Sequence, residues 1–284
     1  MFQKASKKKA KARVAFIGPS GSGKTYTALT LAKYLGKKIA VIDTERGSAS
    51  KYSGDVADFD ACELPTFEPK KYIEALNFAA SEGYDVIVID SLTHAWTGEG
   101  GLLDQKDKKG GNSFDVWRTL TPQHNALVEA ILGYPGHVIA TMRVKTEYVV
   151  EKDERGKSVP RKVGLAPVQR DGLEYEFDVV ADMDPDNCMH VSKSRCPALS
   201  GASIRKPDRQ VAEDLLAWLD DGVDAPKRKT HADVIVEKAA ESVAEAKELA
   251  RKAWKTLTAD ERERVTLAIQ NAESAVGTEG EAAE

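Results

Sequence analysis

Gly18-Pro19-Ser20-Gly21-Ser22-Gly23-Lys24-Thr25 is the stretch of sequence that decides the fold. An apolar run, residues 14–17, precedes it, and a helix-compatible segment, residues 26–35, follows it. This is the phosphate-binding pattern G-x-x-x-x-G-K-[ST] in its strand–loop–helix context. Its glycines let the backbone curl so that successive amides point at an anion, and the helix that follows adds its positive dipole end. The stretch therefore predicts a site for a nucleoside triphosphate.

Each position of this loop has an expected role. We expect the backbone of the loop to surround the phosphates and the lysine ammonium to reach the β- and γ-phosphates. We expect the threonine hydroxyl to be a ligand of Mg²⁺. The predicted binding residues are Gly18, Ser20, Gly21, Ser22, Gly23, Lys24 and Thr25.

Composition limits the class of protein. The 284 residues, 42% of them hydrophobic, allow one large α/β domain plus an appendage. No apolar run is long enough to span a membrane, and the basic N-terminus lacks the apolar stretch of a secretory signal. Three cysteines without metal-ligand spacing fit a reducing compartment, so we expect a cytoplasmic protein with no membrane partner. A net charge of −4 argues against a globally basic nucleic-acid binder.

Strand and helix patterns alternate along the chain, which predicts an α/β fold with a mostly parallel sheet flanked by helices. Aliphatic runs predict strands at residues 38–43, 85–90, 137–142, 178–183 and 189–194. Amphipathic segments predict helices at residues 69–80, 114–132 and 208–219. Residues 97–113, rich in Gly and Lys, are expected to form a flexible loop, and residues 145–164 a second mobile loop or a hairpin.

Three domains are expected. Residues 1–12 form a basic arm that is either solvated and mobile or in contact with DNA or a partner, and residues 13–223 form the core. Residues 224–284 are predicted to be a small helical hairpin, with one long helix over 232–255 and a second that begins at the capping box at 258–261. Residues 277–284 are expected to be a disordered acidic tail.

Two acids follow strands at the expected ligand-binding edge of the sheet. Asp90 ends an aliphatic run, where an acid can hold magnesium directly or through water; the alternative is an Asp that caps the next segment. Glu45 follows the run at 38–43, where a carboxylate can deprotonate an attacking water; the alternative is a surface Glu at a strand end.

The order of these motifs resembles the RecA-type recombination ATPases. The phosphate loop is followed by Val41-Ile42-Asp43-Thr44-Glu45 and then by Val86-Ile87-Val88-Ile89-Asp90-Ser91, and the resemblance covers residues 13–205. It implies a RecA-like core that uses ATP and Mg²⁺, with Glu45 as catalytic base and Thr25 and Asp90 on the metal side. It also implies that Tyr52 stacks on adenine, although a packed loop tyrosine is an equal alternative.

The resemblance extends to basic residues. Lys193 and Arg195 resemble the paired cations that reach a neighbouring subunit's ATP; the alternative is an exposed strand end. Arg143 and Lys145 resemble the start of the family's second DNA-binding loop, and Lys108 and Lys109 would lie in the first. Thr141 stands where the family usually has Gln or Asn as γ-phosphate sensor. Phe2-Gln3-Lys4-Ala5 matches an oligomerisation signature in only two letters, and coincidence is the favoured interpretation.

The resemblance looks closest to small phage-type single-strand annealing proteins. The expected function is an ATP-dependent, single-stranded-DNA-binding recombination or annealing protein, with ATP hydrolysed at a site between subunits. The expected partners are single-stranded DNA, further copies of the chain in a filament or ring, and a single-strand DNA-binding protein or another replication or recombination protein. Alternatives are a P-loop nucleotide kinase and a helicase- or loader-type ATPase that uses ATP as a conformational switch.

Overall fold

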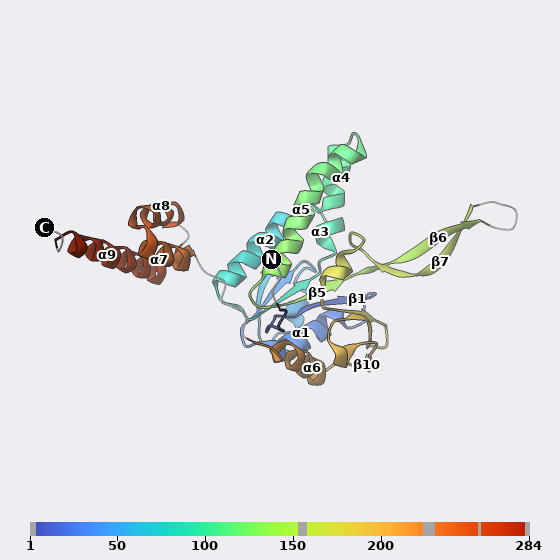
Figure 1. Cartoon of the computed structure of the whole chain (residues 1–284). Coiled ribbons are helices and arrows are strands. Elements are labelled where there is room, and N and C mark those ends of the chain that lie inside the picture. Colours follow the sequence, from blue (N-terminus) through green and yellow to red (C-terminus); the bar gives the residue numbers. More distant parts are fainter. Residues whose placement is uncertain (1–3, 153–157, 224–230, 255–256, 282–284) are drawn as a thin grey trace. The chain divides into compact units, whose positions relative to one another are not determined.

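Short aliphatic runs form the centre of the sheet. In β1 (Arg13–Ile17), β4 (Val86–Asp90) and β5 (His137–Met142) every residue is buried, as expected of strands covered on both faces. The computed structural model describes residues 4–152, 158–223, 231–254 and 257–281 (Figure 1). It divides the chain into two units, Met1–Asp224 and Ala225–Glu284.

The larger unit contains an eight-stranded sheet in the order β10-β9-β8-β1-β5-β4-β2-β3. The strands from β8 to β3 are parallel, and β9 and β10 continue the sheet as antiparallel strands at one edge. The remaining strands of this sheet are β2 (Ile39–Asp43), β3 (Asp60–Glu63), β8 (Val179–Met183), β9 (Cys188–Ser194) and β10 (Ser203–Arg205). The predicted α/β class is confirmed.

Alternate residues of β1 belong to two separate cores. Val14 and Phe16 belong to the core that includes residues of α1 (Lys24–Leu35) and α6 (Arg209–Asp220). Ala15 and Ile17 belong to the core with α2 (Pro69–Ser81) and α5 (Ser113–Gly133). Helices therefore cover both faces of the sheet. The carboxyl ends of its parallel strands all point the same way, and ligands bind at these strand ends in this architecture.

The prediction of a flexible loop at 97–113 is wrong. The segment contains the end of α3 (His94–Thr97), all of α4 (Leu102–Lys109) and the start of α5. Leu102 is fully buried against Val116 and Leu120 of α5, and this tertiary contact stabilises a helix that is too short to be stable alone. Residues 94–120, here called the helical arm, extend beyond the sheet (Figure 1).

The predicted second loop is a hairpin. β6 (Val144–Lys152) and β7 (Ser158–Pro167) pair antiparallel in a separate two-stranded sheet. The backbone of Arg143 closes its base, because Val168 N donates to Arg143 O at 2.8 Å. The described residues of this unit also form three short 3-10 helices: η1 (Ala49–Tyr52), η2 (Leu173–Glu176) and η3 (Pro197–Leu199).

The basic N-terminal segment is attached to the core in its second half. Lys9 N donates to Val223 O at 2.9 Å, and the Lys7 ammonium forms an ion pair with Asp221 at 2.8 Å. A fully mobile arm is therefore wrong for these residues. Phe2 and Gln3, half of the weak oligomerisation signature, lie outside the described residues.

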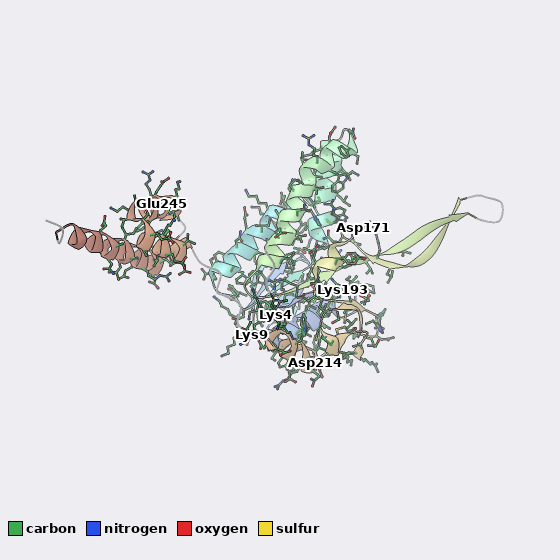
Figure 2. All side chains as sticks on the ribbon, viewed as in Figure 1. Lys4, Lys9, Asp171, Lys193, Asp214 and Glu245 are labelled. Atoms are coloured by element: carbon green, nitrogen blue, oxygen red, sulfur yellow. The ribbon has the colours of Figure 1, made fainter. Side chains whose placement is uncertain are left out.

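The described part of the C-terminal unit contains three helices, not the two of a hairpin. α7 (His231–Glu241), α8 (Val243–Ala253) and α9 (Ala259–Glu281) share a small core that includes Ile235 and Val265. Ser242 separates the first two helices, because its side chain accepts a hydrogen bond from Glu245 N and so caps the start of α8. Glu245 is labelled in Figure 2. The expected disordered tail is helical as far as Glu281, and its last three residues lie outside the described part.

Candidate functional site

The loop between β1 and α1 has a backbone that only glycine accommodates easily. Gly21 and Gly23 have φ values of +80° and +82°. A Cβ on Gly18 would lie 2.4 Å from Met183 O, so the loop and β8 are in close contact there. The Ser22 hydroxyl donates to Pro19 O at 2.9 Å and braces the curled loop from inside. These contacts give the loop the shape that its sequence predicts.

Lys24 begins α1 and turns back over the loop. Its ammonium donates to Pro19 O at 2.7 Å, and burial lowers its pKa while Asp90 and Glu45 oppose that shift. A carbonyl is a weak partner for a full positive charge, so an incoming phosphate can readily replace it.

Asp90 ends β4 and is held by two hydroxyls. Thr25 donates to Oδ2 at 2.8 Å, and Thr141 from β5 donates to Oδ1 at 2.5 Å. Burial raises the pKa of Asp90, whose exposed fraction is 2%, and the two hydroxyl hydrogen bonds oppose that shift. A threonine hydroxyl beside a carboxylate is an oxygen donor set that suits Mg²⁺ together with phosphate oxygens. No all-protein cluster of metal ligands occurs in the described part of the chain.

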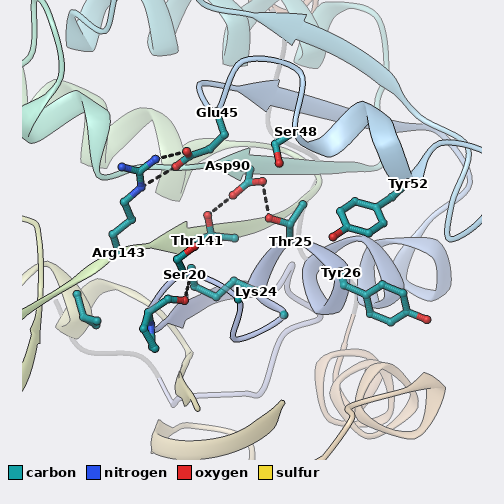
Figure 3. Close-up of a pocket in the computed structure, with 14 residues that line it drawn as sticks. Ser20, Lys24, Thr25, Tyr26, Glu45, Ser48, Tyr52, Asp90, Thr141 and Arg143 are labelled. Atoms are coloured by element: carbon teal, nitrogen blue, oxygen red, sulfur yellow. Dashed lines mark hydrogen bonds and ion pairs between the residues drawn. The ribbon is translucent and has the colours of Figure 1, made fainter. Parts of the chain in front are cut away.

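Glu45 follows β2, and both oxygens of its carboxylate have hydrogen-bond partners. Arg143 Nε donates to Oε1 at 2.9 Å, and Arg143 Nη2 pairs with Oε2 (Figure 3). Ser91 Oγ also donates to Oε1, at 3.0 Å. Burial alone would raise the pKa of Glu45, but the hydrogen bonds and charge of Arg143 outweigh it, so the pKa lies below its ordinary value. Asp43 fixes the backbone here, because its Oδ1 accepts from Glu45 N at 2.6 Å. The carboxylate stays ionised and is aimed by its neighbours.

These groups line one cleft of about 570 Å³. Its lining residues are Pro19, Ser20, Gly21, Gly23, Lys24, Thr25, Tyr26, Glu45, Ser48, Tyr52, Asp90, Thr141, Arg143 and Val144 (Figure 3). Of the predicted loop residues, Gly18 and Ser22 lie behind the surface of the cleft and shape it from inside.

Sequence reasoning did not assign Tyr26, Ser48 and Arg143 to the cleft. Arg143 was predicted to contact DNA, whereas the structure places its guanidinium against Glu45, 98 residues away in sequence. The position of Arg143 directly after β5 could have indicated its place in the cleft. β5 runs parallel to β1, so both strands end on the side of the sheet where the phosphate loop lies.

The structure does not bring Lys193 and Arg195 to this cleft. β9 runs antiparallel to β8, so Arg195 lies near the start of β8, toward the sheet edge opposite the phosphate loop. The Lys193 ammonium, labelled in Figure 2, donates to the carbonyls of Tyr175 and Phe177 at 2.5 and 2.7 Å. Arg195 forms an ion pair with Asp178 at 2.9 Å. Within one chain both cations hold the segment that leads into β8.

The other predicted DNA contacts lie on exposed surface. Lys108 forms an ion pair with Asp104 at 2.7 Å, and the Lys109 ammonium donates to Thr119 Oγ1 at 2.8 Å, both near the end of the helical arm. Phe114 projects from the same end with 77% of its surface exposed. Lys145 is exposed at the base of the β6–β7 hairpin. Arm and hairpin thus present basic side chains.

Comparison with known families gives a match that covers most of the larger unit. A family model described as an AAA domain (AAA_24) matches residues 10–200, which include the phosphate loop, β4 and most of the sheet. No curated protein matches the chain. Among the described residues, no helix has both the length and the apolar character needed to cross a membrane.

Proposed function

The chain belongs to the AAA-domain family and has the fold of a P-loop NTPase, and from this premise we propose that it hydrolyses ATP with Mg²⁺ and couples hydrolysis to single-stranded DNA in recombination or annealing. One observation carries the proposal for hydrolysis. Lys24, Thr25, Glu45 and Asp90 line the same cleft, so a phosphate cradle, a metal-side acid and a general base are available together.

Each residue has a defined task in this proposal. The Lys24 ammonium leaves the Pro19 carbonyl for the β- and γ-phosphates. The Thr25 hydroxyl and the Asp90 carboxylate would hold Mg²⁺, and the bound ion would neutralise charge on the phosphates. Glu45 orients the attacking water and accepts its proton, for which it needs to be ionised, as its lowered pKa ensures. Arg143 is the cation nearest the base and can exchange Glu45 for a phosphate oxygen.

The lining of the cleft favours hydrolysis over a kinase reaction. A nucleotide kinase needs cations for a second phosphate group and an acceptor pocket. The described cleft contains one arginine, Arg143, which is already paired with Glu45. A carboxylate held beside the phosphate loop favours activation of water.

The DNA-binding part of the proposal rests on the helical arm. Phe114 is an exposed aromatic side chain close in sequence to the exposed Lys108 and Lys109. Exposed aromatic rings stack on bases, and nearby lysines neutralise the phosphate backbone. Self-assembly is part of the same proposal, and a helicase- or loader-type use of ATP is the alternative within the family.

A binding experiment tests the DNA part. Anisotropy of a labelled oligothymidine is measured with ATP and Mg²⁺ over a salt series for wild type, Lys108→Ala/Lys109→Ala and Phe114→Ala. The double variant is expected to lose affinity several-fold with a shallower salt dependence, and Phe114→Ala to lose on the order of tenfold at every salt concentration. Lys70→Ala/Lys71→Ala, which also removes a lysine paired with an acid four residues away, is the matched control. Equal affinity in all four proteins, or none in wild type, contradicts the proposal.

A further inference from the structure

The end of the cleft beyond Thr25 is lined by two tyrosine rings. Tyr26 follows Thr25 in the first turn of α1, and Tyr52 ends η1. Their ring centroids lie 6.0 Å apart with an interplanar angle of 81°, so the rings form a corner and not a parallel stack (Figure 3). The Tyr26 side chain is 51% exposed, so it has ring surface left for a ligand.

The order of residues along the chain and the lining of the cleft indicate which part of a bound nucleotide would lie between the two rings. Lys24 and Thr25 are the groups for the terminal phosphates and metal, and Tyr26 is the next residue along the helix. A nucleotide bound along the cleft therefore directs its base away from Lys24, toward the two rings. A base placed in a corner of two rings has its face on one ring and its edge against the other, which is a favoured aromatic geometry.

We propose that Tyr26 is the second wall of the base subsite, beside Tyr52, and that this subsite accepts purines with little discrimination between adenine and guanine. The inference rests on the proposed nucleotide binding and adds the residue and specificity of its base end. Among the described lining residues, Tyr26, Tyr52 and Ser48 each carry a hydroxyl. A hydroxyl both donates and accepts, so it can match either purine edge.

Strong discrimination between bases needs polar groups that are left unpaired by the wrong base. The described lining has no carboxamide side chain, and its two carboxylates, Glu45 and Asp90, are already bonded to Arg143 and to the hydroxyls of Thr25 and Thr141. Base selection therefore depends on stacked ring area, which is larger for a purine than for a pyrimidine.

The test compares ligands that share the phosphates and differ in the base. Dissociation constants for ATP, GTP, CTP and inorganic tripolyphosphate are measured with Mg²⁺ by calorimetry. Wild type is expected to bind ATP and GTP within about fivefold of each other and CTP more weakly. Tyr26→Ala is expected to lose on the order of tenfold for both purines while tripolyphosphate affinity is unchanged, and Tyr26→Phe to retain purine binding. Tyr34→Ala, a partly exposed tyrosine two turns along α1, is the matched control.

Two results overturn the inference. A wild-type preference above about fiftyfold for ATP over GTP would show base-specific hydrogen bonds, because stacking alone does not separate purines so far. An equal loss for ATP and tripolyphosphate in Tyr26→Ala would show that the ring supports the phosphate loop and not the base. Failure of the underlying function is distinct: wild type would then bind neither tripolyphosphate nor any nucleotide.

Discussion

Glu45→Gln removes the proposed base while keeping its shape. The amide oxygen can still accept from Ser91 Oγ, and the Arg143 guanidinium keeps one acceptor. A positioned general base contributes roughly 10²–10⁴-fold in rate, which is about 3–5 kcal/mol of activation barrier. We therefore expect turnover to fall at least a hundredfold. ATP affinity should stay the same or increase, because a negative charge near the phosphates is removed.

The fold should survive this substitution. The Glu45 and Arg143 side chains are 21% and 51% exposed, so solvent screens their ion pair and its loss costs about 0.2–1 kcal/mol. For a unit of this size, that lowers Tm by at most about 4 °C. The assay is steady-state phosphate release beside ATP titration and thermal melting. Glu63→Gln, at the exposed end of the neighbouring strand β3, is the control. Turnover within threefold of wild type, with ATP binding intact, would refute the assignment of Glu45 as base.

Three further predictions concern the groups around the cleft and β9. Arg143 holds the pKa of Glu45 below its ordinary 4.5, so the carboxylate should stay ionised as pH falls to about that value. In a plot of kcat/KM against pH, the loss of activity on the acidic side should therefore occur at a lower pH in wild type than in Arg143→Gln. Thr141→Val removes a hydroxyl that donates to buried Asp90, so urea unfolding should show a loss of about 1–3 kcal/mol, whereas an unchanged midpoint would contradict the geometry. Lys193→Ala removes the ammonium that donates to two backbone carbonyls, so this variant should have a lower Tm than wild type. If Lys193 also acts in catalysis across subunits, a mixture of the Lys193→Ala and Glu45→Gln proteins should regain turnover. If the role of Lys193 is only structural, the mixture should not regain turnover.

The core of the fold was predictable because its strands are aliphatic and its loop has a fixed chemistry. Buried parallel strands require continuous apolar runs, and β4 and β5 have them. β3 was missed because all four residues of this edge strand are exposed, so no apolar pattern marks it. The division between α7 and α8 did carry a signal, since Ser242 and Glu245 have capping-box spacing, but the surrounding helical composition obscured it.

The candidate site was predictable where local sequence determines it and not where tertiary pairing does. A loop motif and a strand end were enough to predict the lining residues Ser20, Gly21, Gly23, Lys24, Thr25 and Asp90. The pairing of Glu45 with Arg143 depends on the register of β2, β4 and β5, which sequence patterns do not give. The same limit applies to Lys193, whose carbonyl partners come from η2 and the residue after it.

ATP hydrolysis with and without single-stranded DNA, followed beside particle size, is the decisive measurement. We predict Mg²⁺-dependent turnover that rises when single-stranded DNA is added, in assemblies larger than one chain, and that disappears in Glu45→Gln. If the protein is monomeric and its turnover does not change when DNA is added, the proposed coupling is contradicted. If phosphate is transferred to an added nucleoside monophosphate, the reaction is that of a kinase and not ATP hydrolysis.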